Sequence, residues 1–347
     1  MSEFRIDQIT NQSGSRGPDI AGITTFSGTS GMVMPSGPTE YRGGRGRGVL
    51  GGGNTPTVVN TIDYITISTL GNASDFGDLN AVNSETGSFA SSTHGFFAGG
   101  LNPSTLSTIT RVTTSSTGNS FTFGELDSTY WGGSGLSDTT RGIYGRGRDP
   151  SSGSFVDTYE IQYINMSSGG KTSFFGNLSD NKLNLGTCAS PTRGIFFAGG
   201  SPRINNIEFI TISTLGNAQE FGDALTPIHR IPGISNTIRG VFGGGYISGT
   251  PASISTNVIS YITIASTGDA IDFGDLTQDR YSAGGVCSST RGVFMGGLNV
   301  AAPIYTRVNT IDYITIASTG NASDFGDLTQ GRATGSSFSD AHGGLGD

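Results

Sequence analysis

One short motif, a phenylalanine and a glycine followed in most copies by an acid and a leucine, recurs through most of the chain and constrains its fold more than any other feature. The steps between successive copies are 47, 52, 46, 52 and 52 residues. Repeats of this length are units of a stack or a ring, because a single unit cannot bury its apolar face alone. The sequence therefore predicts six equivalent units, whose copies of the motif begin at Phe76, Phe123, Phe175, Phe221, Phe273 and Phe325.

Each repeat consists of short apolar runs separated by turn residues. In the last copy these runs are 284–290, 291–297, 309–317 and 324–328. The chain contains 57 glycines, and only 13% of its residues are charged, which is not typical of a helical protein. Four strands in roughly 50 residues match one blade of a β-propeller. We therefore expect an all-β fold with a six-bladed β-propeller over residues 45–347.

The positions at which the repeats start and stop predict how the ring closes. The first copy begins at its second strand, at Arg47, with no first strand before it. The last copy is followed by an additional first strand, residues 333–340. This C-terminal strand can complete the blade that the N-terminal strands begin, which leaves no exposed edge between the two ends.

The second strand of each repeat carries a resemblance. It begins with arginine and glycine, continues with an aliphatic and an aromatic residue and ends in glycines, as in Arg193-Gly194-Ile195-Phe196 and Arg291-Gly292-Val293-Phe294. Together with a tyrosine in the third strand, this pattern resembles kelch-type propeller repeats. One departure is that phenylalanine stands where those repeats carry tryptophan, and Trp131 is the only tryptophan. The resemblance concerns the fold and implies no activity.

Residues 1–44 contain no copy of the repeat. They hold strand-like apolar positions, among them Phe4, Ile6, Ile9 and Phe26. A segment of this length cannot bury a core of its own, so it either docks on another surface or is a flexible tail. The apolar positions favour docking, and we take these four residues as candidate docking residues.

The leader and the repeats together carry a second resemblance. Residues 4–14 and 22–28, followed by repeats such as residues 311–322, resemble structural proteins of tailed marine bacteriophages, especially phages of cyanobacteria. The resemblance implies a virion protein, made in the host cytoplasm, that joins other virion proteins through residues 1–44. It further implies a place on a tail fibre or similar appendage and allows a homo-oligomer on the particle.

The residues needed for catalysis are scarce. The chain has three histidines, His94, His229 and His342, with no zinc-ligand spacing, nucleophile elbow or phosphate loop around them. We therefore expect no enzyme and no cofactor. The net charge of -8 disfavours nucleic acid as a partner, and no apolar run is long enough to predict membrane insertion.

Two further sets of residues recur with the repeat. The acids of the motif could suggest calcium, but an acid at a fixed place in each unit is more simply a turn cap or a partner of a repeat arginine. We expect the arginines at 47, 141, 193, 239 and 291 to bridge strands or blades through their planar donor groups. Cys188 and Cys287 occupy similar places in different repeats, so we expect buried thiols and no disulfide.

The loops between the second and third strands vary in length and sequence, whereas the loops at the other end are short and uniform. Variation on a rigid frame is how binding surfaces are commonly built. We take Tyr246, Tyr305, Arg148 and Arg203 as candidate binding residues on these loops, and we expect the two tyrosines to be exposed and able to stack on sugars. The expected function is contact with a host-surface receptor or glycan. The alternatives are a purely architectural decoration or connector of head, neck or tail, and a cellular protein-interaction propeller.

Overall fold

The computed structural model describes residues 26–27, 31–32, 46–150, 156–200, 202–248, 253–301 and 304–346. The chain divides into two compact units, Met1–Gly43 and Gly44–Asp347. In the first unit, β1 (Phe26–Ser27) and β2 (Gly31–Met32) form a short antiparallel pair. The candidate docking residues Phe4, Ile6 and Ile9 lie outside the described residues, and Phe26 is placed in β1 by its backbone.

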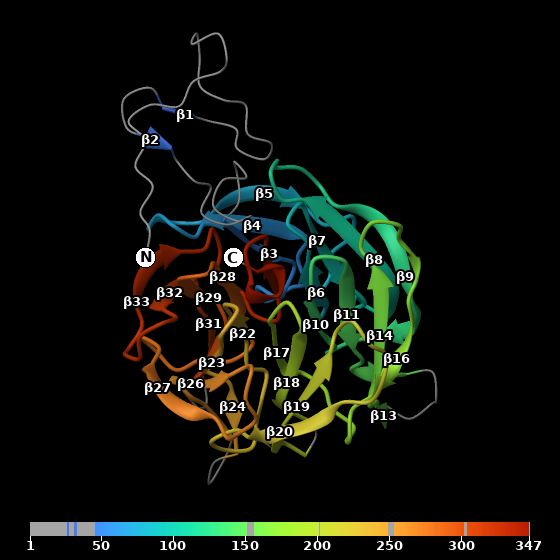
Figure 1. Ribbon diagram of the computed structural model, residues 1–347. Coiled ribbons are helices and arrows are strands. Elements are labelled where there is room, and N and C mark those ends of the chain that lie inside the picture. Colours follow the sequence, from blue (N-terminus) through green and yellow to red (C-terminus); the bar gives the residue numbers. More distant parts are fainter. Residues whose placement is uncertain are drawn as a thin grey trace, which may run out of the picture. The chain divides into compact units, whose positions relative to one another are not determined.

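The second unit is built around six large sheets with antiparallel neighbours (Figure 1). Five of them have four strands, and sheet 2 has a fifth, β15 (Gly170–Lys171), which pairs in parallel with β9. Sheet 1 holds β34 (Ser336–Ser339), β3 (Arg47–Gly51), β4 (Thr61–Thr66) and β5 (Ser74–Asp78), and sheet 2 holds β6 (Gly87–Ala90), β7 (His94–Ala98), β8 (Leu106–Thr113) and β9 (Phe121–Tyr130). Sheet 3 holds β10 (Ser134–Ser137), β11 (Arg141–Gly145), β14 (Glu160–Asn165) and β16 (Ser173–Asn177), and sheet 4 holds β17 (Gly186–Ala189), β18 (Arg193–Gly199), β19 (Ile204–Thr211) and β20 (Gln219–Asp223). Sheet 5 holds β22 (Gly233–Ser235), β23 (Arg239–Gly243), β26 (Val258–Thr263) and β27 (Ile271–Asp275), and sheet 6 holds β28 (Gly284–Cys287), β29 (Arg291–Met295), β32 (Thr310–Thr315) and β33 (Ser323–Asp327). The all-β prediction is confirmed.

The ends of this unit meet in sheet 1. The C-terminal strand β34 pairs antiparallel with β3, with Gly48 opposite Ser339 and Gly51 opposite Ser336. Sheet 1 therefore takes one strand from the C-terminal end and three from the N-terminal end. The pairing predicted for residues 333–340 is confirmed.

The innermost strands of the six sheets contact one another in cyclic order. The order runs β34, β6, β10, β17, β22 and β28 and returns to β34. Just before these strands, six backbone N–H groups each donate to the carbonyl of the equivalent residue in the preceding sheet, at 2.7 to 3.0 Å. The six residues form a closed hydrogen-bonded cycle, and we call them the mouth ring: Glu85, Gly132, Asn184, Arg230, Ser282 and Thr334.

The mouth ring has a special backbone conformation. All six of its residues have positive φ, between 52° and 68°. Five of them are not glycine, although this conformation costs about 1 kcal/mol or more for a residue with a Cβ. The closed cycle of hydrogen bonds offsets that cost, and it leaves five side chains around one opening.

The cores lie between neighbouring sheets. One cluster joins Leu50 and Ile65 of sheet 1 to Val286 and Val293 of sheet 6. Glycine in the second strand makes room for the neighbouring side chain: a Cβ on Gly142, which follows Arg141, would lie 2.3 Å from the ring of Phe89. The glycine of the recurring arginine-glycine pair is therefore needed for close packing between sheets.

The repeat arginines bridge adjacent sheets, as predicted. Nη1 of each donates to a backbone carbonyl that follows the third strand of the next sheet, at 2.8 to 3.0 Å. The same guanidinium lies over an aromatic ring of its own sheet, at 4.5 to 5.2 Å from the ring centroid. The five donors are Arg47, Arg141, Arg193, Arg239 and Arg291, and their acceptors are Thr114, Ile212, Ile264, Ile316 and Ile67.

The repeated phenylalanine-glycine motif lies in the fourth strand of each sheet, which is the outermost strand except in sheet 2, where β15 pairs beyond it. In the other five sheets this strand holds a turn of the next sheet. The N–H groups of Gly71 and Ala73 donate to the carbonyls of Phe325 and Asp327, and Oδ1 of Asn72 accepts from the Asp327 N–H. Backbone groups make these contacts, and the repeat arginines bond to carbonyls. The expectation that the acids cap turns or pair with these arginines is therefore corrected. In the described part of the chain, no group of three or more His, Cys, Asp or Glu side chains could hold a metal ion.

Both cysteines are buried free thiols, as predicted, but their positions are not equivalent. Cys188 pairs with Ile195, whereas Cys287 pairs with Gly292. The two therefore differ by one residue in register, and successive residues of a strand point to opposite faces. The loops that follow the two strands are equally long, so the shift lies in the strands themselves: Cys188 is five residues before Arg193, and Cys287 is four residues before Arg291. Among the described residues, no helix is long and apolar enough to cross a membrane.

Candidate ligand-binding face and channel

The variable loops share one end of the ring with the mouth ring. The second strand runs antiparallel to the first, so it returns the chain to the end at which the first strand began. Bridges fix this placement, since Ser84 pairs with Leu101 and Tyr281 pairs with Leu298. We call this end, with the mouth ring and the loops between second and third strands, the loop face.

Two of the four candidate binding residues come together on this face. The Arg203 guanidinium, in the loop before β19, lies 4.7 Å from the ring centroid of Tyr246 in β24 (Tyr246–Ile247). Arg203 also donates to the hydroxyls of Ser248 and Ser253. The pair therefore joins the loops of sheets 4 and 5.

Tyr246 does not present a free ring, contrary to its prediction as an exposed stacking residue. Its centroid lies 4.6 Å from that of Tyr281 and 5.7 Å from that of His229, in addition to the Arg203 contact. The side chain is only partly exposed. Tyr246 is thus the centre of a packed polar-aromatic cluster and supports the loop face.

The other two candidates lie elsewhere on the loop face. Tyr305, in β31 (Ile304–Arg307) of the hairpin with β30 (Leu298–Ala301), is 58% exposed, as predicted. Arg148, in β12 (Arg148–Asp149), lies over the ring of Trp131 at 5.3 Å. The structure therefore distributes the four candidates over the loops of four sheets and does not gather them into one site.

His229 is the histidine most affected by its surroundings on this face. Burial and the nearby cations Arg230 and Arg203 lower its pKa to about 4. The imidazole is therefore neutral at pH 7. Its ring lies nearly parallel to that of Tyr246, with 16° between the planes, so it acts as a flat packing group.

The mouth ring is crossed by an ion pair. Arg230 belongs to sheet 5 and Glu85 to sheet 2, which lie opposite each other in the cyclic order of six. Nη1 of Arg230 lies 2.6 Å from Oε1 of Glu85 and 3.2 Å from Oγ of Ser282. Although burial alone would lower it, the Glu85 carboxylate raises the pKa of Arg230, so the guanidinium is charged near neutral pH.

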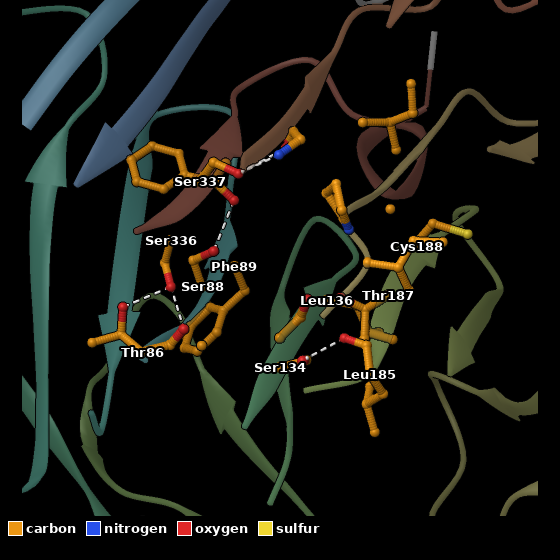
Figure 2. Close-up of a pocket in the computed structure, with 18 of the residues that line it drawn as sticks. Thr86, Ser88, Phe89, Ser134, Leu136, Leu185, Thr187, Cys188, Ser336 and Ser337 are labelled. Atoms are coloured by element: carbon orange, nitrogen blue, oxygen red, sulfur yellow. Dashed lines mark hydrogen bonds between the residues drawn. The ribbon is translucent and has the colours of Figure 1, made fainter. Parts of the chain in front are cut away.

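Behind the mouth ring is a cavity of about 180 Å³, lined by the innermost strands. Its hydroxyl groups donate to backbone carbonyls of neighbouring sheets: Ser88 to Ser337 and Thr187 to Gly135, both at 2.7 Å. Figure 2 shows these side chains around the cavity, with the bonds from Ser88 and from Ser134 drawn as dashed lines. The lining includes two carboxylate or guanidinium groups, Glu85 and Arg230, which pair with each other.

The C-terminal turn covers the other end of the cavity. The short 3-10 helix η1 (Gly343–Leu345) contacts β10, β17 and β22, and Leu345 is buried. A Cβ on Gly344 would lie 1.8 Å from the Ser137 carbonyl oxygen, so only glycine permits this close approach. The C-terminal turn therefore borders the cavity at this end, and His342 is among the residues that line it.

One serine-histidine contact lies beside this turn. Nε2 of His342 lies 3.2 Å from Oγ of Ser137 and 3.1 Å from the Ala90 carbonyl oxygen. Because Nδ1 accepts the N–H of Gly344, the proton of a neutral ring is on Nε2. Such a histidine donates to its neighbours and cannot take a proton from Ser137, so this contact is not an activated nucleophile.

Sequence comparison adds no assignment: no model of a known protein family matches the chain, and no curated protein is significantly similar to it. The interpretation of the site therefore depends on its geometry. Sequence reasoning located the loop face but missed the mouth ring. The six mouth-ring residues are all of different types, so no common residue type identifies this position in the repeats.

Proposed function

We propose that residues 45–347 form a six-bladed, kelch-like β-propeller, in which each of the six large sheets is one blade. The closed cycle of six backbone hydrogen bonds in the mouth ring is the observation that carries this proposal. The pairing of β34 with β3 supports it, because one shared sheet joins the two ends of the repeat array. A ring of this kind holds its loops in fixed positions without a hinge.

We further propose that the protein is a non-enzymatic structural protein of a phage virion, displayed on a tail fibre or similar appendage. The support is the resemblance of the leader and repeats to structural proteins of marine phages. Residues 1–44 attach the protein to other virion proteins. The loop face contacts a receptor or glycan on the host surface.

The geometry of the loop face supports a binding role more than an architectural one. Side chains of four different sheets lie on this face around one opening, and Tyr305 is exposed beside the packed cluster of Tyr246. The opposite end carries short, uniform turns and the buried η1. A protein that binds through one end needs this asymmetry, because its variable residues must reach the same partner.

Two measurements test the proposal. Particles are examined for the full-length protein and for a variant lacking residues 1–44; the proposal predicts that only the full-length protein is incorporated. The purified 45–347 unit is then tested for adsorption to host cells and for inhibition of infection. Incorporation of the truncated protein, or absence of the full-length protein from particles, contradicts the virion assignment. Incorporation without adsorption or inhibition favours the architectural alternative of a decoration or connector.

A further inference from the structure

Arg307 differs from every other arginine that the structure describes. Each of the others donates a side-chain hydrogen bond, forms an ion pair or lies over an aromatic ring. Arg307, in β31, does none of these within the described residues. Arginine stays protonated in proteins, so the charge of Arg307 has no counter-ion in the described part of the fold.

The terminal nitrogens of Arg307 are within reach of a ligand. The residue is half-buried, and its Nε is buried without a hydrogen-bond partner among the described residues. Nη1 and Nη2 also have no partner there, but they are not buried. A cation that is partly withdrawn from water gains from a bound anion, because burial weakens its hydration. Nη1 and Nη2 can hold a carboxylate through two parallel hydrogen bonds.

Arg307 lines a groove of the loop face at which the loops of three sheets meet. Sheet 6 contributes Arg307 and Leu298, sheet 1 contributes Asn54 and Val58, and sheet 2 contributes Leu101. These sheets are neighbours in the cyclic order. The groove has a volume of about 430 Å³ and is open to solvent, and this size is in the range of small-molecule sites.

Backbone hydrogen bonds fix the walls of the groove. The N–H of Asn54 donates to the Ala333 carbonyl at 2.8 Å. Leu298 and Tyr281 exchange two backbone hydrogen bonds, at 2.8 and 3.0 Å. The groove is therefore formed before a ligand arrives, which reduces the entropic cost of binding.

The lining of the groove favours a ligand with one negative charge and an apolar body. Its solvent-accessible lining is mainly apolar, with valine, proline and leucine side chains. Glu85 also lines the groove, but Arg230 neutralises it, so Arg307 carries the only unpaired charge among the described lining residues. A single carboxylate matches that charge. A phosphate monoester, with up to two negative charges, would leave excess negative charge beside Glu85.

We infer that this groove binds an organic molecule through one carboxylate group, which Arg307 holds, while the body of the molecule packs against the apolar lining. Nδ2 of Asn54, on the same groove, is accessible and has no partner among the described residues, so it offers a second donor. The inference concerns the loop face alone and does not depend on the virion role.

The decisive variant is Arg307→Gln, which removes the charge and retains a polar side chain. Because the Arg307 side chain bonds to no described residue, we expect an unchanged melting temperature. Arg307→Lys retains the charge but not the planar donor group, so it should bind with intermediate affinity. Lys171→Gln is the matched control, since it also removes one positive charge. Lys171 is exposed in β15 and does not line the groove.

The probes are three carboxylates, each paired with an uncharged counterpart. They are N-acetylleucine with N-acetylleucinamide, cyclohexanecarboxylate with cyclohexanecarboxamide, and methyl glucuronide with methyl glucoside. Ligand-observed NMR and isothermal titration measure their binding to the full chain. We expect at least one carboxylate to bind, at least about tenfold more tightly than its counterpart. Its Kd should rise at least about tenfold in Arg307→Gln and change less than about twofold in Lys171→Gln.

Three results would overturn the inference. They are the absence of binding by every carboxylate, equal binding of a carboxylate and its uncharged counterpart, and unchanged affinity in Arg307→Gln. Inorganic phosphate, which has no apolar body, should displace the bound carboxylate only at a concentration at least about tenfold higher. Displacement by phosphate at equal concentration shows a site for inorganic anions and contradicts the role of the apolar lining.

These outcomes are separate from those of the proposed function. Carboxylate binding by the purified protein, combined with absence of the protein from particles, supports the groove and contradicts the virion role. Host adsorption by a protein that binds no carboxylate contradicts the groove and leaves the receptor-binding role intact.

Discussion

The guanidinium of Arg230 and the carboxylate of Glu85 meet across the mouth ring, 2.6 Å apart, although the two residues are 145 positions apart in the chain. They belong to sheets 5 and 2, on opposite sides of the cycle. The backbone hydrogen bonds of the mouth ring join neighbouring sheets around the opening. The ion pair, in contrast, joins the two sides across it.

This cross-link predicts the effect of Arg230→Met. The substitution leaves the Glu85 carboxylate, only 13% exposed, without its partner. We expect the free energy of unfolding to fall by about 1 to 3 kcal/mol, less than for a fully buried pair because water still reaches both groups. Urea denaturation measures the change. The double variant Arg230→Met/Glu85→Leu should regain most of the loss; a double variant as unstable as the single one contradicts this explanation.

A second prediction concerns a buried ion pair that only some sheets contain. In sheet 6, Nη2 of Arg280 lies 2.7 Å from Oδ2 of Asp312, and both side chains are 0% exposed. Sheet 5 has Ile228 and Ser260 at the equivalent places, which are also buried. We expect Asp312→Ser alone to lower the free energy of unfolding by about 3 to 5 kcal/mol, because it strands a buried cation.

The matched variant is Arg280→Ile/Asp312→Ser, which gives sheet 6 the two residue types that sheet 5 has at the equivalent positions. It should be clearly more stable than Asp312→Ser, since an apolar pair carries no desolvation penalty. Thermal and urea denaturation compare the three proteins. If the double variant is no more stable than the single one, the loss of stability in Asp312→Ser does not come from the unpaired Arg280 cation, and the explanation is wrong.

The sequence predicted those features of the structure in which the same side chain recurs in each repeat. The outer-strand phenylalanines marked six sheets, and the residues around Arg47 and 333–340 located the closing strand. The five repeat arginines were expected to bridge sheets, and they do. These features could be predicted because the same side chain makes the same contact in each repeat.

The parts that the sequence did not reveal depend on the backbone or on single copies. The mouth ring is bonded through N–H and C=O groups, so its positions can hold glutamate in one sheet and glycine in another. The Arg230–Glu85 pair occurs once and connects distant repeats. Tyr246 was taken as exposed because a tyrosine in a loop gives no sign of the three side chains that cover it.

The closing strand gives a third prediction. A chain ending at Arg332 lacks β34, so β3 becomes an exposed edge strand and Phe338 leaves the core beside Phe97. We expect this truncation to abolish the cooperative thermal transition or to give soluble aggregates, because unpaired edges associate. Circular dichroism and size-exclusion chromatography are the measurements. Deletion of residues 1–43 is the control and should leave the melting temperature unchanged, since those residues form a separate compact unit. A truncated chain that melts like the parent contradicts the role of β34 in closure.

The last prediction is a pH dependence of stability that originates at His229. Its pKa is about 4 in the folded protein, lowered by burial and then by Arg230 and Arg203, and 6.5 is the ordinary value for an unfolded chain. Between these two values the unfolded state binds more protons than the folded state, so the free energy of unfolding must decrease as the pH falls. The loss is absent above about pH 7 and amounts to no more than about 3 kcal/mol at pH 4. His229→Gln retains a flat polar side chain but cannot titrate, so the parent should lose more stability than the variant between pH 7 and pH 4. Urea denaturation at both pH values measures this difference, with pH 8 as the reference at which both side chains are neutral. Parallel stability curves for the two proteins across this range show that His229 is readily protonated in the folded state.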